Sequence, residues 1–371
     1  MKKYMVWSER DGNLDCFYIY NTEDMCVEPA PSKYLMHMAR AKKSPNTIER
    51  SARALSYYML YMDEKREELT DVYQMVYEKQ YHHFVDFLYW LKQGKHKEKF
   101  DKPPHDGTCN AYLQDVFRFY LFMEQCEWRG KSLAVLSYSQ FITPNETGVK
   151  KILRSYAFKG YLKAEERNVK AAKRDEIVEL LEACTNCRDQ LLILLLAETG
   201  FRIGELLGVD YTRDIDYENH LIKVNFRDDN ENGARAKNAE YRYAKISGST
   251  FEFLLYYLSE YRKLIQKQKY LFITIAGETA GQSLNVDTVY DMLDRLEKKT
   301  GIKTTPHMLR RYFGNERWRS GWPLEMISHA YGHKHLDTTI KYLNIIDDSL
   351  IEASDRYYEE NSSMYDISRV L

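Results

Sequence analysis

The sequence of residues 331–342 is YGHKHLDTTIKY, and it marks a break between two helices. Gly332 follows a helical pattern, and glycine ends helices readily because it tolerates the left-handed backbone conformation. The aspartate and threonines that follow can cap a new helix, and this second helix carries Tyr342. The pattern therefore predicts that His333, at the break, and Tyr342 face one cavity.

Two other segments, TPHMLRR and TGFRIGELLGV, carry charged side chains at helix boundaries. His307 and Arg310 of the first segment are three residues apart, so they share one face of a helix and can bind one anion together. In the second segment Gly200 ends one helix, and Arg202 and Glu205 stand at the start of the next. Taken singly, each of these side chains has a simpler explanation, such as an ion pair or a packed ring.

The pattern around these segments predicts a mainly helical α+β protein with a small antiparallel sheet. Before residue 150, apolar residues mostly recur at helical spacing. Residues 221–226 and 241–246 have strand patterns and flank a loop that contains Asn-Gly, which is typical of antiparallel strands. The expected division is an N-terminal segment 1–29, a helical domain 30–165 and a second domain 166–371 that ends in the tail 343–371.

The composition is typical of a globular protein with more than one domain. The chain has 371 residues, 44% of them hydrophobic and 29% charged, with few Pro and Gly, which excludes collagen-like and wholly disordered proteins. The longest apolar run, residues 191–197, is too short to span a membrane, and the N-terminus is too polar for a signal peptide. We therefore expect a cytoplasmic protein without a membrane partner.

The cysteines and histidines predict neither a disulfide framework nor a metal centre. The six cysteines are irregularly spaced, and Cys184 and Cys187 form a lone CxxC without a second ligand pair. Zinc bound by His329, His333 and His335 is the alternative, but a glycine interrupts the helix that would align them. We expect no metal and no cofactor.

Charge is distributed unevenly, although the net charge is only −1. Residues 347–371 contain seven acidic and two basic residues, so the rest of the chain is mildly basic. Bases gather in residues 150–174, between the two expected domains, and at the first helix that the pattern predicts. Such runs usually lie on a solvated face, but they can also follow a phosphate backbone. The bases near the first helix are Arg40, Lys42, Lys43, Arg50 and Arg53.

Together the three segments resemble the tyrosine recombinase family, the site-specific recombinases and integrases of phages, transposons and chromosome-dimer resolution. TGFRIGELLGV matches the first arginine box of that family, and PHMLRR matches its His-x-x-Arg box. YGHKHLDTTIKY matches the Gly-His box, with the tyrosine nine residues after the histidine. The resemblance covers about residues 170–345, and residues 30–165 are similar in length and position to the core-binding domain of the family.

The resemblance implies a set of catalytic residues, namely Arg202, Lys237, His307, Arg310, His333 and Tyr342. The lysine of the family lies in a β-hairpin shortly before a strand, which Lys237 fits best, with Lys245 and Lys223 as alternatives. Arg311 and Asn344 depart from residues common in the family, but neither holds one of the catalytic roles.

These residue types suit the cleavage of a phosphodiester on chemical grounds as well. Two arginine forks can bind the non-bridging oxygens, which gain negative charge in the transition state. A tyrosine with a reference pKa of about 10 needs a neighbouring base or positive charge to act as a nucleophile. A lysine on a hairpin can protonate the departing 5′ oxygen as a general acid.

We therefore expect a site-specific recombinase, the integrase or transposase of a mobile element, that acts through a covalent 3′-phosphotyrosyl intermediate. The alternatives are strand swivelling like that of type IB topoisomerases, and a DNA-binding regulator without catalysis. The expected partners are double-stranded DNA, with nucleoid association when bound, three further copies in a homotetramer on two DNA sites, and accessory DNA-bending or directionality factors. The tail mixes acidic and apolar residues, so we expect it to dock on a neighbouring protomer, with docking on its own domain as the alternative.

Overall fold

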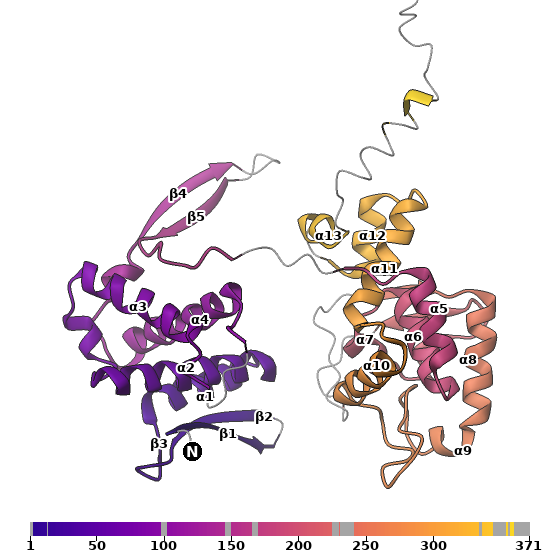
Figure 1. Cartoon of the computed structure of the whole chain (residues 1–371), viewed down its shortest axis with the longest axis horizontal. Coiled ribbons are helices and arrows are strands. Elements are labelled where there is room, and N and C mark those ends of the chain that lie inside the picture. The colour runs from indigo at the N-terminus through magenta and orange to yellow at the C-terminus, as the bar shows by residue number, and fades with distance from the viewer. Residues whose placement is uncertain are drawn as a thin grey trace, which may run out of the picture. The chain divides into compact units, whose positions relative to one another are not determined.

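The computed structural model describes residues 3–12, 14–97, 102–144, 150–164, 170–224, 230, 241–333, 336–343, 354 and 357–359. The chain divides into two compact units, Met1–Arg167 and Asn168–Leu371, and each has a hydrophobic core of its own (Figure 1).

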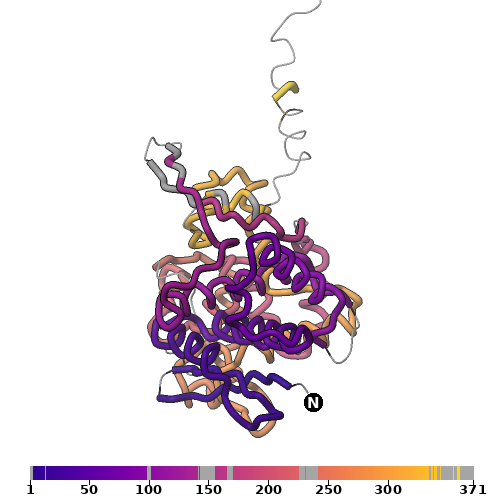
Figure 2. Tube along the Cα trace, turned by 90° about the vertical axis from the view of Figure 1, so that its left-hand side faces the viewer, coloured from indigo at the N-terminus to yellow at the C-terminus, as the bar shows by residue number. Residues whose placement is uncertain are grey.

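The first unit begins with a three-stranded antiparallel sheet, for which the sequence pattern gave no prediction. Its strands are β1 (Tyr4–Asp11), β2 (Leu14–Asn21) and β3 (Cys26–Val27), in that spatial order. Gly12 makes the β1–β2 turn with a positive φ of 58°, a conformation that suits glycine. The sheet lies at the N-terminal end of the chain, drawn in indigo in Figure 2. Phe17 and Ile19 of β2 are buried in the core that the sheet shares with helices of this unit.

Helices make up most of the remainder of the first unit, and aromatic rings fill its core. Tyr58 is fully buried, and its ring packs edge to face on Phe87 and Tyr120. Its hydroxyl shares hydrogen bonds with Tyr120 and His83, as a buried hydroxyl requires. The helices are α1 (Pro29–Arg40), α2 (Pro45–Lys65), η1 (Asp71–Gln74), α3 (Tyr77–Lys92), α4 (Asp106–Cys126) and η2 (Ala134–Leu136).

A hairpin of β4 (Tyr138–Pro144) and β5 (Lys150–Tyr156) extends from these helices (Figure 1). Tyr138 and Tyr156 are paired across its base, with their ring centroids 5.7 Å apart. The basic stretch at residues 150–174 therefore begins as a strand, where its charge pattern suggested a linker.

The second unit packs helices around a small antiparallel sheet of β6 (Ile215–Asp216), β7 (Leu221–Val224) and β8 (Arg242–Lys245). Helix α6 carries the apolar run at residues 191–197 and buries residues on all sides, so it lies within the core. The helices are α5 (Arg174–Ala183), α6 (Cys187–Thr199), α7 (Ile203–Leu207), α8 (Gly248–Glu260), α9 (Arg262–Ile265), α10 (Val286–Thr300), α11 (Pro306–Arg319), α12 (Leu324–Tyr331) and α13 (Leu336–Leu343).

This arrangement confirms the predicted fold class, a mainly helical α+β protein with small antiparallel sheets. Among the helices that the structure describes, not one combines the length and apolarity that a membrane crossing requires.

Helix boundaries in the second unit follow local signals and bring the charged segments together. Thr305 caps α11 by accepting a hydrogen bond from the N–H of Met308, and Pro306 opens the helix. Gly200 and Gly332 end α6 and α12 in the left-handed conformation, with φ of 65° and 63°. The segments that carry Arg202 and His333 therefore start directly at these two helix ends.

Candidate active site

Arg310 lies at the centre of the candidate site and is almost completely buried. Its Nη1 donates a hydrogen bond to the carbonyl oxygen of Gly200 (2.6 Å), and its Nη2 donates one to the carbonyl oxygen of Tyr331 (2.7 Å). Carbonyls at the ends of helices lack partners within the helix and carry partial negative charge, so they suit a guanidinium. Arg310 thus joins the C-terminal ends of α6 and α12.

Tyr331 supports the arginine from the α12 side. The guanidinium carbon of Arg310 lies 4.5 Å from the centroid of the Tyr331 ring, within the range of a cation–π contact. The Tyr331 hydroxyl donates a hydrogen bond to the backbone carbonyl of Arg310 (2.8 Å). The two residues therefore hold each other in place.

Glu205 is a buried carboxylate that is surrounded by three arginines. Its Oε1 lies 2.8 Å from Nη1 of Arg202, its Oε2 pairs with Nη2 of Arg242, and the same Oε2 lies 3.7 Å from Nη1 of Arg310. Burial alone would raise the pKa of Glu205, but the three guanidinium groups, Arg242 foremost, hold it below its ordinary value. Three positive charges and one negative charge leave this cluster with an excess of two positive charges.

His333 stands beside this cluster as a neutral imidazole. The guanidinium of Arg310 can only donate, so Nε2 of His333 accepts from it (3.2 Å), and the ring proton is on Nδ1, which bonds Oγ1 of Thr339 (2.9 Å). Burial, and then the charges of Arg310, Arg202 and Arg242, lower the pKa of His333 to about 3.

We expect the imidazole of His333 to remain neutral in the free protein between about pH 5 and 8, where an ordinary histidine titrates. Because its pKa lies below the value of about 6.5 in the unfolded chain, the folded form binds fewer protons between these two values. This histidine therefore lowers the free energy of unfolding as the pH falls from about 6.5 towards 3.

NMR titration of the imidazole Cε1–H signal checks this expectation, and His333→Gln assigns the signal. The same variant should weaken the dependence of unfolding on pH in this window. A midpoint near 6.5 for the His333 signal would contradict the neutral assignment.

Two further predicted catalytic residues, His307 and Tyr342, lie on the helices α11 and α13. His307 lies exposed in the first turn of α11, one helical turn before Arg310. Tyr342 lies on α13, the helix that also presents Thr339 to His333. The structure thus brings together the side chains of Arg202, Arg310 and His333.

The predicted lysine, Lys237, lies outside the described residues. Of the two alternatives, Lys245 is exposed on β8, and Lys223 lies on β7 with its Nζ 5.7 and 5.8 Å from the ring centroids of Tyr241 and Tyr243. The assignment of the general acid to Lys237 stays a prediction.

The sequence analysis missed the part that Arg242 plays in this cluster. Arg242 is buried between the exposed residues Tyr241 and Tyr243, on the face of β8 that points into the unit. A charged residue at a strand position is usually taken for a solvent-facing one. No local signal in the sequence could have found it, because its partner Glu205 lies 37 residues earlier in the chain.

The structure describes part of the alternative zinc site that the sequence offered at His329, His333 and His335. Within the described part of the chain, no group of three or more His, Cys, Asp or Glu side chains is arranged to hold a metal ion. The zinc alternative includes His335, which lies outside that part. Cys184 and Cys187 are free thiols, and burial raises the pKa of both.

Comparisons with known proteins agree with this geometry. A family model described as the phage integrase family matches residues 170–348, which contain the arginine cluster, His333 and Tyr342. Transposase A from transposon Tn554 of Staphylococcus aureus is 25% identical over 353 residues, which cover 92% of this chain and 94% of that protein. Tyrosine recombinase XerA of Saccharolobus solfataricus is 32% identical over 191 residues, 51% of this chain and 56% of that protein.

Solved structures of low sequence identity share the fold. The Tn1549 transposon integrase in complex with transposon right end DNA has a TM-score of 0.59 at 14% identity, over 88% of this chain and 98% of that one. The XerH site-specific recombinase in a post-cleavage complex has a TM-score of 0.58 at 19% identity, over 84% of this chain and 79% of that one. On the matching family model and the relatives, residues 170–348 of this chain belong to the phage integrase family, the family of the tyrosine recombinases.

Proposed function

We propose that this chain is the integrase or transposase of a mobile element, a site-specific recombinase that cuts and rejoins DNA through a 3′-phosphotyrosyl intermediate. The observation that carries the proposal is the pair Arg202 and Arg310, which Glu205 and two helix ends hold beside His333. Tyr342 lies on the helix that contacts His333. Phosphate activation and a nucleophile are therefore expected in one place.

In this proposal the arginines provide the main electrostatic stabilisation. The phosphorane-like transition state gains negative charge on its non-bridging oxygens, and Arg202 and Arg310 neutralise it in the way that metal ions do at other phosphoryl-transfer sites. The excess of two positive charges in the cluster suits this dianionic state. Guanidinium groups keep their charge at any physiological pH, so this contribution does not depend on protonation.

The remaining roles concern protons. His307 and His333 are proposed to bind the phosphate and to assist the loss of the proton from Tyr342, and Lys237 to protonate the leaving 5′ oxygen. When phosphate replaces Arg310 as the partner of His333, its negative charge should raise the pKa of that histidine and allow it to donate a hydrogen bond.

Double-stranded DNA is the proposed substrate. The Tn1549 transposon integrase is described in complex with transposon right end DNA, and XerH is described as bound to palindromic difH substrate. In the first unit, Arg40, Lys42 and Lys43 are exposed at the turn between α1 and α2 and can contact phosphates. Two other bases near this turn are already paired. Arg50 bonds Asp115, and Arg53 bonds Glu49. We propose residues 30–165 as the DNA-clamping domain and 166–371 as the catalytic domain.

A nicked suicide substrate that carries the cognate site tests the proposal. Cleavage near the nick releases a short fragment with a free 5′-hydroxyl and leaves the protein joined to the 3′-phosphate, and peptide mapping should place the adduct on Tyr342. Tyr342→Phe should lose the adduct and retain DNA binding, because only one hydroxyl is removed. An adduct on that variant, or none on the wild type, would contradict the proposal and in the second case favour a DNA-binding regulator.

Recombination further requires several copies of the chain. Each chain contributes one tyrosine and cuts one strand, so the exchange of two duplexes needs four strand cuts and four protomers. A topoisomerase-like enzyme would cut a single strand as a monomer, and the capture of two duplexes in one complex distinguishes the two. We propose a homotetramer on two DNA sites.

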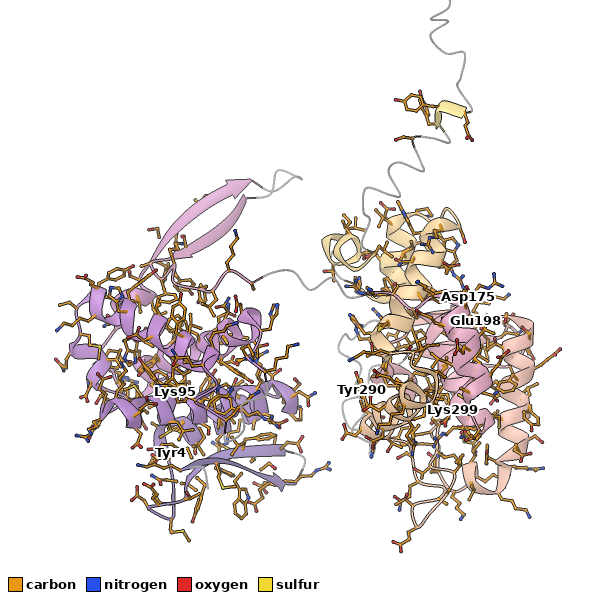
Figure 3. The ribbon with its side chains drawn as sticks, in the orientation of Figure 1. Tyr4, Lys95, Asp175, Glu198, Tyr290 and Lys299 are labelled. Atoms are coloured by element: carbon orange, nitrogen blue, oxygen red, sulfur yellow. The ribbon has the colours of Figure 1, made fainter. Side chains whose placement is uncertain are left out.

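A pocket on the second unit is a suitable receptor for the tail of a neighbouring protomer. It has a volume of about 710 Å³ and is lined mainly by α11, α12, β8 and the end of α6, where Glu198 lies (Figure 3). Its large apolar side chains include Phe313, Trp322 and Met326. Residues 344–371 are rich in isoleucine, leucine and tyrosine, which such a pocket can bury.

Deletion of the residues after Asp348 should leave binding to a single DNA site intact and abolish the complex of two sites in native gels and sedimentation. Met326→Glu, which places a charge in the pocket at a half-exposed position, should have the same effect.

If tails dock in trans, a mixture of the truncated protein and Met326→Glu should regain partial assembly, because the truncated protein offers an intact pocket and Met326→Glu offers an intact tail. No recovery would indicate docking in cis, and normal synapsis by the truncated protein would exclude the tail from assembly.

A further inference from the structure

Arg242 is a buried charge next to the candidate site. It is 2% exposed, on the first residue of β8, and its backbone pairs with Val224 of β7. Its guanidinium carbon lies 5.3 Å from the centroid of the Phe201 ring. Burial of a charge at such a position is unfavourable unless the charge is paired, so its contacts should have a function.

One side of the Arg242 guanidinium faces Glu205, and the other faces the end of α12. A Cβ added to Gly332 would lie 2.6 Å from its Nη1 and 3.2 Å from its Cζ, so the guanidinium packs directly on the backbone next to His333. Its Nε and Nη1 are buried and have no hydrogen-bond partner among the described residues. Arg242 thus fills the space between the carboxylate and the residue that precedes His333.

The pairing of Arg242 decides how much positive charge the other two arginines retain. Arg242 takes Oε2 of Glu205 as an ion pair, whereas Nη1 of Arg310 stays 3.7 Å from the same oxygen and bonds the Gly200 carbonyl. Without Arg242, this carboxylate oxygen would have Arg310 as its nearest cation. The cluster would then keep an excess of one positive charge rather than two.

We propose that Arg242 is a positioning residue of the cleavage site, which occupies Glu205 so that Arg202 and Arg310 keep their charge for the scissile phosphate. The inference rests on the proposed function. It assigns a role in the reaction to a side chain whose guanidinium lies between Glu205 and the end of α12.

Single-turnover cleavage by Arg242→Met at saturating protein tests this role. On an ordinary nicked substrate we expect cleavage to slow about tenfold or more, the scale of losing one nearby charge. On a substrate with a methylphosphonate at the scissile position, one charged oxygen is replaced by a methyl group, so the transition state carries less negative charge. The defect of the variant relative to wild type should there shrink to less than about threefold.

A second-site change keeps the test decisive if Arg242→Met alone folds poorly. The double variant Arg242→Met/Glu205→Gln removes one positive and one negative charge, and restores an excess of two positive charges. It should therefore cleave the ordinary substrate faster than Arg242→Met does, and Arg242→Lys, which keeps the charge, should be the least impaired variant. A double variant slower than Arg242→Met would overturn the proposal.

Arg188→Met is a matched control, because Arg188 is another buried arginine of the same unit. It bonds Asp189 and the carbonyl of Ile273, away from the cluster, so its loss should cost stability without a difference between the two substrates. An equal defect of Arg242→Met on both substrates would reduce Arg242 to a structural role. A substrate with a sulfur atom in place of the scissile 5′ oxygen has a leaving group that needs little protonation. If that substrate restored cleavage by Arg242→Met, the arginine would act on the leaving group, which would also overturn the proposal.

The wild-type protein separates this inference from the function on which it rests. If wild type forms no adduct, the proposed function fails. If wild type forms the adduct and Arg242→Met cleaves as fast, only the role of Arg242 fails.

Discussion

Arg310→Lys is expected to slow strand cleavage by about 100-fold or more, the scale of removing one preorganised donor to a transition-state oxyanion. Lysine keeps the positive charge but is a single point donor. It cannot bond the carbonyls of Gly200 and Tyr331 and also offer a fork to the phosphate, as the planar guanidinium can. The loss should appear in the rate of adduct formation at saturating DNA, with DNA affinity nearly unchanged.

The rate of adduct formation must be divided by the fraction of folded protein, because Arg310 also bonds the ends of two helices and its replacement can lower stability. Thermal unfolding and circular dichroism of each variant supply this correction. Arg188→Lys provides the matched control, since Arg188 is also buried and also bonds a backbone carbonyl but lies outside the cluster. Cleavage by Arg310→Lys within a few-fold of the control would show that charge alone suffices and that the fork is dispensable.

Gly314→Ala should destabilise the second unit by about 3 kcal/mol, at the upper end of the usual cost of overpacking a core. A Cβ at this position would lie 1.9 Å from the Tyr331 hydroxyl oxygen and 2.7 Å from Cδ2 of Leu343. Tyr331 cannot yield easily, because it is fully buried and its hydroxyl is bonded to Arg310. The added methyl group must therefore separate α11 from α12 and disturb the placement of α13.

Urea unfolding of the whole chain, followed by probes in each unit, measures this effect. Gly248→Ala is the control, because a Cβ there meets nothing within 4 Å and Gly248 opens α8. Cleavage by Gly314→Ala should fall more than its folded fraction does, since Leu343 is next to Tyr342. Equal stability of the two alanine variants would show that the contact between α11 and α12 can open without cost.

The helix-boundary signals predicted much of the geometry of the site. The glycines at positions 200 and 332 were predicted to end helices, and both do so in the left-handed conformation. The three-residue spacing of His307 and Arg310 correctly predicts one helix, α11, for both. Sequence spacing says nothing, however, about distances between segments more than a hundred residues apart, so the bond from Arg310 to Gly200 could not be derived from it.

Strand faces were harder to predict. Alternation along residues 241–246 shows two faces, but tyrosine suits a core or a surface equally, and the burial of Arg242 depends on a carboxylate from a distant helix. In the first unit, Asp11-Gly12 between two alternating segments is a hairpin signal, and the β1–β2 hairpin forms there. Most residues of β1 are exposed, so the strand gives a weak periodic signal, which explains why that sheet went unpredicted.

The hydrogen bonds of Arg310 to the ends of α6 and α12 bear on how this enzyme can decay in evolution. A descendant that no longer needs to cut DNA no longer needs a nucleophile, for which we propose the tyrosine on α13. Loss of the arginine, in contrast, leaves two buried helix ends unsatisfied and threatens the fold itself. Retired copies of such a gene should therefore keep the arginine long after the tyrosine has drifted, so the presence of the arginine does not by itself mark a working enzyme.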